Sequence, residues 1–149
     1  MARIDVLTEI DIGRPRNLVS AYAANPSNAP EWYDNIKSVD WMTAPPVRLG
    51  SKMDFVAQFL GRRLAYTYEV VELVPGERLV MRTEQGPFPM ETTYTWQDTV
   101  NGGTHMTLRN RGEPSGFSKV GAPLMAAAVR RETRKNLRYL KTLLEKTPA

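Results

Sequence analysis

The chain has 149 residues, of which 42% are hydrophobic and 24% charged, and its formal net charge is +4. This length suffices for one compact domain and is too short for two typical ones, so we expect a single domain over residues 1–149. The absence of cysteine excludes disulfides, thiolate metal sites and cysteine nucleophiles. No stretch is apolar enough for a membrane span, and the charged start does not resemble a signal peptide, which favours a cytoplasmic protein.

The first third of the chain predicts one strand followed by two short helices. Apolar and charged residues alternate over residues 3–12, as in a half-buried strand. Gly13 and Pro15 end this pattern, and Pro15 suits the first turn of a short helix through residues 18–23. Two asparagines and two prolines in residues 25–30 then break the chain, so we expect a second helical turn over residues 31–33.

The middle of the chain predicts an antiparallel meander. A period of two returns in six segments, which are residues 36–42, 51–60, 63–74, 78–85, 89–98 and 104–111. Short links rich in glycine and proline separate them, as in hairpins. Gly102 and Gly103 are better explained as a tight turn that needs a positive φ than as a phosphate-binding loop.

The last third predicts one long amphipathic helix over residues 117–146, because apolar residues recur at spacings of three and four. Pro123 must be either a first-turn residue or a kink. The helix also carries a basic stripe of Arg130, Arg131, Arg134, Lys135, Arg138 and Lys141. A basic stripe can contact phosphate, but no nucleic-acid-binding motif accompanies it, so we interpret it as a solvated face and expect no nucleic-acid partner.

Strand parity predicts which side chains face the helix, because alternate residues share a face. The inner set is Met53, Phe55, Ala57, Tyr66, Tyr68, Val70, Leu79, Met81, Thr83, Met90, Thr92, Tyr94, Trp96, Met106, Leu108 and Asn110. Its hydroxyl and amide groups need partners if they are buried. Either water or a ligand satisfies them inside a cavity, or the hydroxyls reach the sheet edge and the methionines fill the core.

We expect the cavity, and a hydrophobic small molecule within it. The candidate ligand-binding residues are Trp32, Phe55, Tyr66, Tyr68, Met81, Met90, Tyr94, Trp96, Met106, Leu108, Asn110, Met125, Val129 and Asn136. Tyr68, Tyr94 and Asn136 are candidate catalytic residues, although the sequence shows no neighbour that would activate them. Glu132 or Thr133 on the predicted helix could also approach the cavity and take part in acid/base chemistry. Trp32 and Tyr33 either form part of the mouth or staple the helical insert to the sheet.

Several segments together resemble the START/Bet v 1-like (SRPBCC) superfamily, and in particular its polyketide cyclase/dehydrase-like branch. They are Asn25-Pro26, Pro30-Glu31-Trp32-Tyr33, Pro75-Gly76-Glu77-Arg78-Leu79, Gly86-Pro87-Phe88, Gly102-Gly103-Thr104 and Thr133-Arg134-Lys135-Asn136-Leu137. The resemblance implies an α+β helix-grip fold: a seven-stranded antiparallel sheet curved around a long C-terminal helix, with two short helices after the first strand. It also implies a cavity for lipids, sterols or polyketides.

Two functions are consistent with this resemblance. The first is a carrier or sensor that binds a lipid, polyketide or similar molecule; the alternative is a polyketide cyclase/aromatase or dehydratase acting in the same cavity. Aromatic polyketide cyclases are thought to use cavity arginines, but the matching inward positions here are Tyr68, Val70 and Thr83. Arg82 would enter the cavity only if a β-bulge reversed the parity of its strand.

Other chemistry has little support in the sequence. The single histidine, His105, is predicted on the outer face, which argues against histidine triads and multi-histidine metal sites. No Walker loop or GxGxxG motif is present. We therefore expect no metal and no cofactor, and nothing in the sequence predicts the oligomeric state.

Overall fold

Seven strands form one antiparallel sheet in the computed structural model, which describes residues 3–113 and 121–146. The strands are β1 (Ile4–Ile12), β2 (Ile36–Trp41), β3 (Lys52–Phe59), β4 (Arg62–Val74), β5 (Arg78–Gln85), β6 (Met90–Asp98) and β7 (Thr104–Gly112). Their order in the sheet is β1-β7-β6-β5-β4-β3-β2. The strands from β2 to β7 therefore form the predicted meander, and β1 closes it beside β7.

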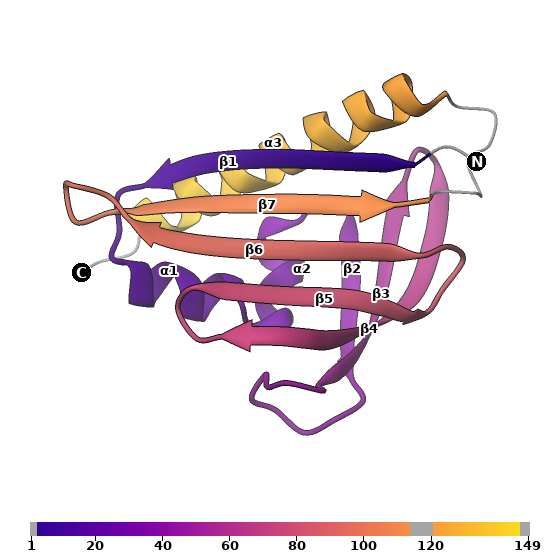
Figure 1. Cartoon of the computed structure of the whole chain (residues 1–149), viewed down its shortest axis with the longest axis horizontal. Coiled ribbons are helices and arrows are strands. Elements are labelled where there is room, and N and C mark those ends of the chain that lie inside the picture. Colours follow the sequence, from indigo (N-terminus) through magenta and orange to yellow (C-terminus); the bar gives the residue numbers. More distant parts are fainter. Residues whose placement is uncertain (1–2, 114–120, 147–149) are drawn as a thin grey trace.

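The helices lie on one side of this sheet (Figure 1). They are α1 (Arg16–Ala23), the 3₁₀ turn η1 (Pro26–Asn28), α2 (Ala29–Trp32) and α3 (Ala122–Lys146). The long helix α3 runs behind β1 and β7, while α1 and α2 lie below it in the same view. This is the helix-grip architecture, so the predicted fold class is confirmed.

The sheet curves around the helices because β4 is long and irregular. Its pairing with β5 shifts register twice, between Thr67 and Tyr68 and again between Val70 and Glu72. Such bulges bend a strand and increase its twist. As a result β2, β3 and the upper part of β4 turn away from the direction of β1 and β7, which leaves a concave face toward α3 (Figure 1).

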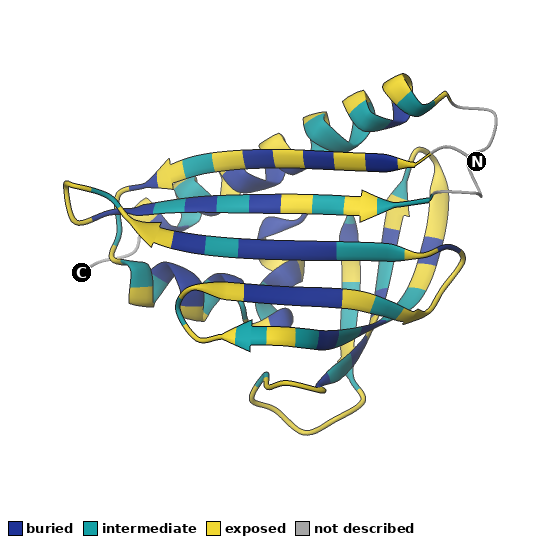
Figure 2. Cartoon of the chain, viewed as in Figure 1, coloured by how far each residue is buried: buried dark blue, intermediate teal, exposed yellow. Residues whose placement is uncertain are grey.

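Burial alternates along the strands as the sequence predicts (Figure 2). Every residue of the predicted inner set is buried or partly buried. Two residues predicted on the outer face, Val80 and Thr93, are nevertheless only 4% and 6% exposed. They pair directly across β5 and β6, and Thr93 also lies in register with Arg109, whose long aliphatic stem can cover an apolar neighbour.

The start of α3 differs from the prediction. The helix begins at Ala122, and Gly121 precedes it as a non-helical residue whose carbonyl accepts a hydrogen bond from the Met125 amide at 2.9 Å. Pro123 therefore stands in the first turn, where its missing N–H costs nothing, and it does not kink the helix. The predicted residues 117–120 lie outside the described part of the chain.

Candidate functional site

A cavity of about 150 Å³ lies between the concave face of the sheet and the helices. Its wall is contributed by β1 to β7, by the segment from α1 to the start of β2, and by α3. Eight of the predicted ligand-binding residues line it: Phe55, Tyr66, Tyr68, Met81, Tyr94, Asn110, Val129 and Asn136. A space of this size accommodates roughly one aromatic ring.

Aromatic rings from neighbouring strands form one wall of the cavity. Phe55 on β3 lies opposite Tyr66 on β4, and their rings are stacked with centroids 5.5 Å apart. Tyr68 meets both rings edge-on, at 5.6 Å from Phe55 and 5.0 Å from Tyr66. Offset-stacked and edge-to-face pairs at these distances are the favoured arrangements of aromatic rings. The period-two pattern of β3 and β4 thus places three rings on the same wall.

The tyrosine hydroxyl groups of the cavity are connected in short chains. The hydroxyl of Tyr68 lies 2.8 Å from Thr92 Oγ1, which in turn donates to Asn110 Oδ1 at 3.1 Å. Because the threonine hydroxyl has a single proton and gives it to Asn110, Tyr68 must be the donor to Thr92. The hydroxyls of Tyr33 and Tyr94 bond to each other at 2.7 Å.

Burial keeps these phenols neutral. It raises the pKa of Tyr68 to about 12, and it also raises the pKa of Tyr33, Tyr66 and Tyr94. At neutral pH they are therefore uncharged hydrogen-bonding groups.

Tyr66 differs from the other cavity tyrosines because its hydroxyl makes no hydrogen bond within the described residues. Its position depends on Gly86, since a Cβ at Gly86 would lie only 2.9 Å from the Cβ of Tyr66. A side chain at position 86 would push the ring. Tyr66 therefore offers the cavity a hydrogen-bonding group that no described neighbour uses.

A pair of carboxyl groups stands at one end of the cavity. Glu132 on α3 lines the cavity, and its carboxyl group is hydrogen-bonded to that of Asp34, which follows α2. Burial, and then the neighbouring Asp34, raise the pKa of Glu132 to about 7. The hydrogen bonds from Glu132 and Lys135 lower the pKa of Asp34, and Lys135 forms an ion pair with it. Asp34 is thus the charged partner, and Glu132 carries the exchangeable proton.

Asn136 lies one turn after Glu132 and joins α3 to the same segment. Its Oδ1 accepts a long hydrogen bond from the Asp34 amide at 3.4 Å, and its Nδ2 approaches Asn35 Oδ1 at 3.5 Å. The side chain is 1% exposed and also lines the cavity. Asn136 therefore joins α3 to the segment before β2 and also borders the cavity.

Six predicted ligand-binding residues do not line the cavity: Trp32, Met90, Trp96, Met106, Leu108 and Met125. They are buried or partly buried in the apolar clusters that close the fold around it. Trp96 instead lines a separate open cleft beside Trp41 and Pro46. Trp32 packs the helical insert against the sheet, with its ring 5.9 Å from that of Tyr94 on β6. Tyr33 is the residue of this pair that lines the cavity.

The cavity also contains residues that were not among the predicted ligand-binding residues. Tyr33, Ala57, Thr92 and Glu132 are examples. Strand parity placed Ala57 and Thr92 on the inner face, so the sequence pattern could have predicted that they line the cavity. The sequence pattern could not have predicted the pairing of Glu132 with Asp34, because that pairing depends on how α3 lies against the segment after α2.

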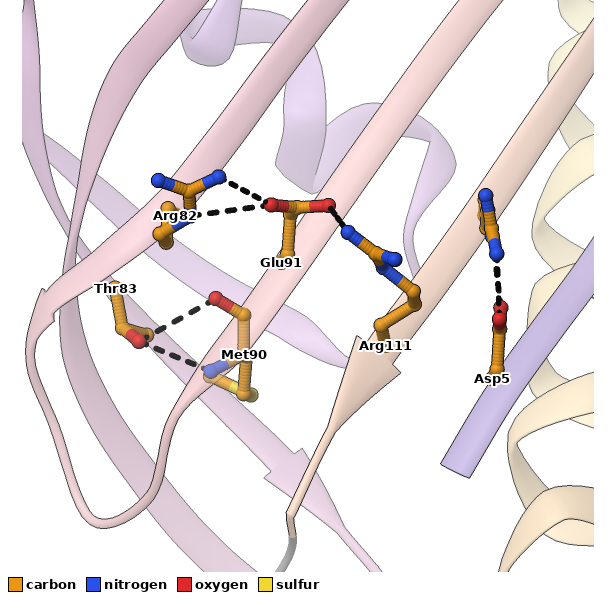
Figure 3. Close-up of polar contacts among 7 residues, drawn as sticks. Asp5, Arg82, Thr83, Met90, Glu91 and Arg111 are labelled. Atoms are coloured by element: carbon orange, nitrogen blue, oxygen red, sulfur yellow. Dashed lines mark hydrogen bonds and ion pairs between the residues drawn. The ribbon is translucent and has the colours of Figure 1, made fainter. Parts of the chain in front are cut away.

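The outer face of the sheet carries paired charges (Figure 3). Glu91 accepts from Arg82 at 2.7 Å and from Arg111 at 2.6 Å, and Asp5 on β1 pairs with Arg109. Burial would raise the pKa of Glu91, but the hydrogen bonds from its two arginines outweigh it and lower the pKa. Arg82 therefore lies outside, and the bulges in β4 do not bring it into the cavity.

Within residues 3–113 and 121–146, no group of three or more His, Asp or Glu side chains could hold a metal ion. His105 lies on the outer face, with its ring nitrogens 2.7 Å from Glu9 and 2.5 Å from Asp11. In the same part of the chain no helix is long and apolar enough to cross a bilayer.

Several solved structures share this fold. The START superfamily protein from Mycobacterium smegmatis superposes with a TM-score of 0.81 at 13% identity, covering 95% of this chain and 97% of that one. TTHA0849 from Thermus thermophilus gives 0.79 at 18% identity, covering 97% and 100%. The Zhui aromatase/cyclase from Streptomyces sp. R1128 gives 0.78 at 15% identity, covering 97% and 94%. At these identities the likeness concerns the fold alone.

A search of curated proteins finds no match. The family model described as "Polyketide cyclase / dehydrase and lipid transport", by contrast, matches residues 3–145, which is nearly the whole chain. This match agrees with the helix-grip sheet and with the cavity beneath α3. The chain is a member of the polyketide cyclase/dehydrase and lipid transport family, within the SRPBCC superfamily.

Proposed function

We propose that this protein binds a small hydrophobic, partly aromatic molecule in the cavity beneath α3, as a carrier or sensor. The observation that carries this proposal is the cavity itself, about 150 Å³ walled by apolar groups and neutral tyrosines. One of those tyrosines, Tyr66, has a hydroxyl without a partner among the described residues. An apolar pocket with a few polar groups that fix orientation is the usual form of a small-molecule site.

The expected affinity follows from the size of the cavity. Burying an aromatic ring removes roughly 150–250 Å² from water, which contributes about 4–6 kcal/mol before the cost of association. A free energy of this size corresponds to dissociation constants from about 40 μM to about 1 mM at best, so we expect single-ring probes to bind in the high-micromolar to millimolar range. Molecules of polyketide length require the helices to move away from the sheet.

Ala57 offers a direct test. Its side chain lines the cavity and is 3% exposed, whereas Ala65 on the neighbouring strand is exposed on the outer face. Ala57→Phe should fill the cavity and abolish the binding of indole or phenol, measured by calorimetry, while Ala65→Phe should leave it unchanged. Native mass spectrometry of the purified wild type checks the proposal without any substitution. A wild type that copurifies empty and binds no apolar probe would refute the proposal.

A second candidate function is a polyketide cyclase/aromatase or dehydratase acting in the same cavity. Glu132 favours it, because a cavity carboxyl with a pKa of about 7 can both donate and accept protons near neutral pH. The absence of an arginine from the described cavity wall weighs against it. On this hypothesis Tyr68→Phe or Asn136→Ala changes the products formed from a poly-β-keto substrate without unfolding the protein. An unchanged product distribution in both variants would exclude this candidate.

We also propose that residues 1–149 form a single ligand-binding domain that acts in the cytoplasm without a nucleic-acid partner. The pairing of β1 with β7, which joins the first strand to the last, supports the single domain.

A further inference from the structure

The charges around the cavity are strongly asymmetric. Glu132 is the only described lining residue whose side chain can be charged near neutral pH, and no lysine, arginine or histidine is among them. The other polar groups are phenols, hydroxyls and amides. A carboxylate head inside the cavity would therefore face a carboxyl group and no cation. The neighbouring cations Lys37, Arg131 and Lys135 line the outer groove instead, and Lys135 is already paired with Asp34 there. Such an arrangement disfavours fatty acids and other anions, because a buried charge needs an opposite partner.

Glu132 stands where the cavity meets the exterior. Together with Asn35 and Phe59, it lines both the cavity and an outer groove beside the β3–β4 hairpin. A ligand held there can keep its polar head at the wet end of the site while its apolar body extends inward. The inner part supplies the faces and edges of Phe55, Tyr66 and Tyr68. Aromatic rings attract cations as well as apolar groups.

We propose that the ligand is a small amine with an apolar, partly aromatic body, whose ammonium group binds the Glu132 carboxylate while its ring lies among the cavity tyrosines. This inference rests on the proposed binding function and specifies the chemical class of its ligand. An ammonium donates up to three hydrogen bonds, so besides the Glu132 carboxylate it can bond to neutral oxygen acceptors of the cavity wall.

The groups that surround Glu132 determine how binding depends on pH. Asp34 faces it from the segment after α2, and Lys135 and Arg131 act on it from α3 itself. Lys37 on β2 acts on Asp34, and Asn35 and Asn136 are neutral neighbours. Since Asp34 has a lowered pKa and pairs with Lys135, it remains ionised, and Glu132 is the group that titrates near neutrality. Amine binding should therefore strengthen as the pH rises through about 7 and weaken as Glu132 becomes protonated.

Three probes of matched size test the inference: 2-phenylethylamine, 2-phenylethanol and phenylacetate. An alkylammonium has a pKa near that of lysine, about 10.4, so the amine stays charged from pH 6 to 8.5. In calorimetric titrations at pH 8.5 we expect the amine to bind about tenfold more tightly than the alcohol, because a charge-assisted hydrogen bond replaces a neutral one. Phenylacetate should bind more weakly than both. Between pH 8.5 and 6 the advantage of the amine should shrink, while the affinity of the alcohol stays constant.

Two variants locate the effect. Glu132→Gln keeps the shape and a hydrogen-bond donor toward Asp34, and should bind the amine no better than the alcohol. Glu145→Gln, the same substitution on the same helix but outside the cavity wall, should retain the preference. If a variant folds poorly, the pH series on the wild type still tests whether the Glu132 carboxylate binds the ammonium group.

The outcomes separate the two proposals. Equal or tighter binding of the alcohol or phenylacetate at pH 8.5, or an unchanged amine preference in Glu132→Gln, would overturn the amine assignment and leave cavity binding standing. If none of the three probes binds the wild type, both proposals fail.

Discussion

Replacing Glu132 by glutamine should stabilise the folded protein at alkaline pH. The folded state holds this carboxyl at a pKa of about 7, above its ordinary value of 4.5, so it binds a proton that the unfolded chain has already released. A group with a raised pKa of this kind destabilises the fold progressively as the pH rises from 4.5 through 7. A glutamine removes the charge and retains an amide that can donate to Asp34.

The magnitude follows from the pKa difference. Complete burial would make the cost at pH 8 roughly 3 kcal/mol. The Glu132 side chain is partly exposed, so solvent screening reduces the expected gain to about 1 kcal/mol. Urea denaturation of the wild type and Glu132→Gln at pH 8 and pH 5 measures it, and the gain should be larger at pH 8.

Glu145 gives a control of opposite sign. Hydrogen bonds from Lys141 and from the Gly13 amide lower its pKa, so the ionised form stabilises the fold. Glu145→Gln should therefore lose stability at pH 8. A Glu132→Gln variant that is less stable than the wild type at pH 8, or a difference that does not change with pH, would refute this account of the carboxyl pair.

Three further predictions concern the frame around the cavity. Leu140 is fully buried on α3, so Leu140→Ala should lower the free energy of unfolding by about 2–5 kcal/mol. The neighbouring Tyr139 is 51% exposed, so Tyr139→Ala should lower it by well under half as much. Equal losses in urea melts would contradict this packing. Gly103 leaves no room for a Cβ, which would lie 2.7 Å from the Ile12 carbonyl oxygen, so Gly103→Ala should lower the melting temperature by several degrees. An unchanged melting temperature would show that the β6–β7 turn can shift. The pKa of His105 is raised, chiefly by the hydrogen bond to Asp11, so the charged imidazole stabilises the fold at pH 6. This contribution is lost as the pH rises through the raised pKa. His105→Gln should therefore cost more stability at pH 6 than at pH 9, and the reverse order would contradict the ion pairs on the outer face.

The arrangement of strands and helices was largely readable from residue patterns. Period-two alternation placed Phe55, Tyr66, Tyr68 and Tyr94 on the inner face, because the side-chain direction in a strand is a local property of the backbone. The spacing of three and four predicted α3 for the same reason. Its first residue was missed because Pro123 is compatible with both a helix start and a kink.

The residue patterns did not predict which part of the inner face borders the cavity and which part is filled core. Met106 and Leu108 share the face of the cavity tyrosines, yet they lie in the filled part of the fold. Which part of a concave sheet is filled depends on where the helices cross it. Strand parity carries no information about that crossing.

The sequence by itself therefore determined the elements, the inward faces and the family, because these depend on local periodicity and on short segments of chain. The tertiary structure alone decided the chemistry of the site. Asp34 follows a short helix near the start of the chain and Glu132 belongs to the last helix, and neither residue is unusual in its own segment. Only the docking of α3 against the end of α2 brings the two carboxyl groups together at the cavity, where partial burial and mutual repulsion leave one proton between them.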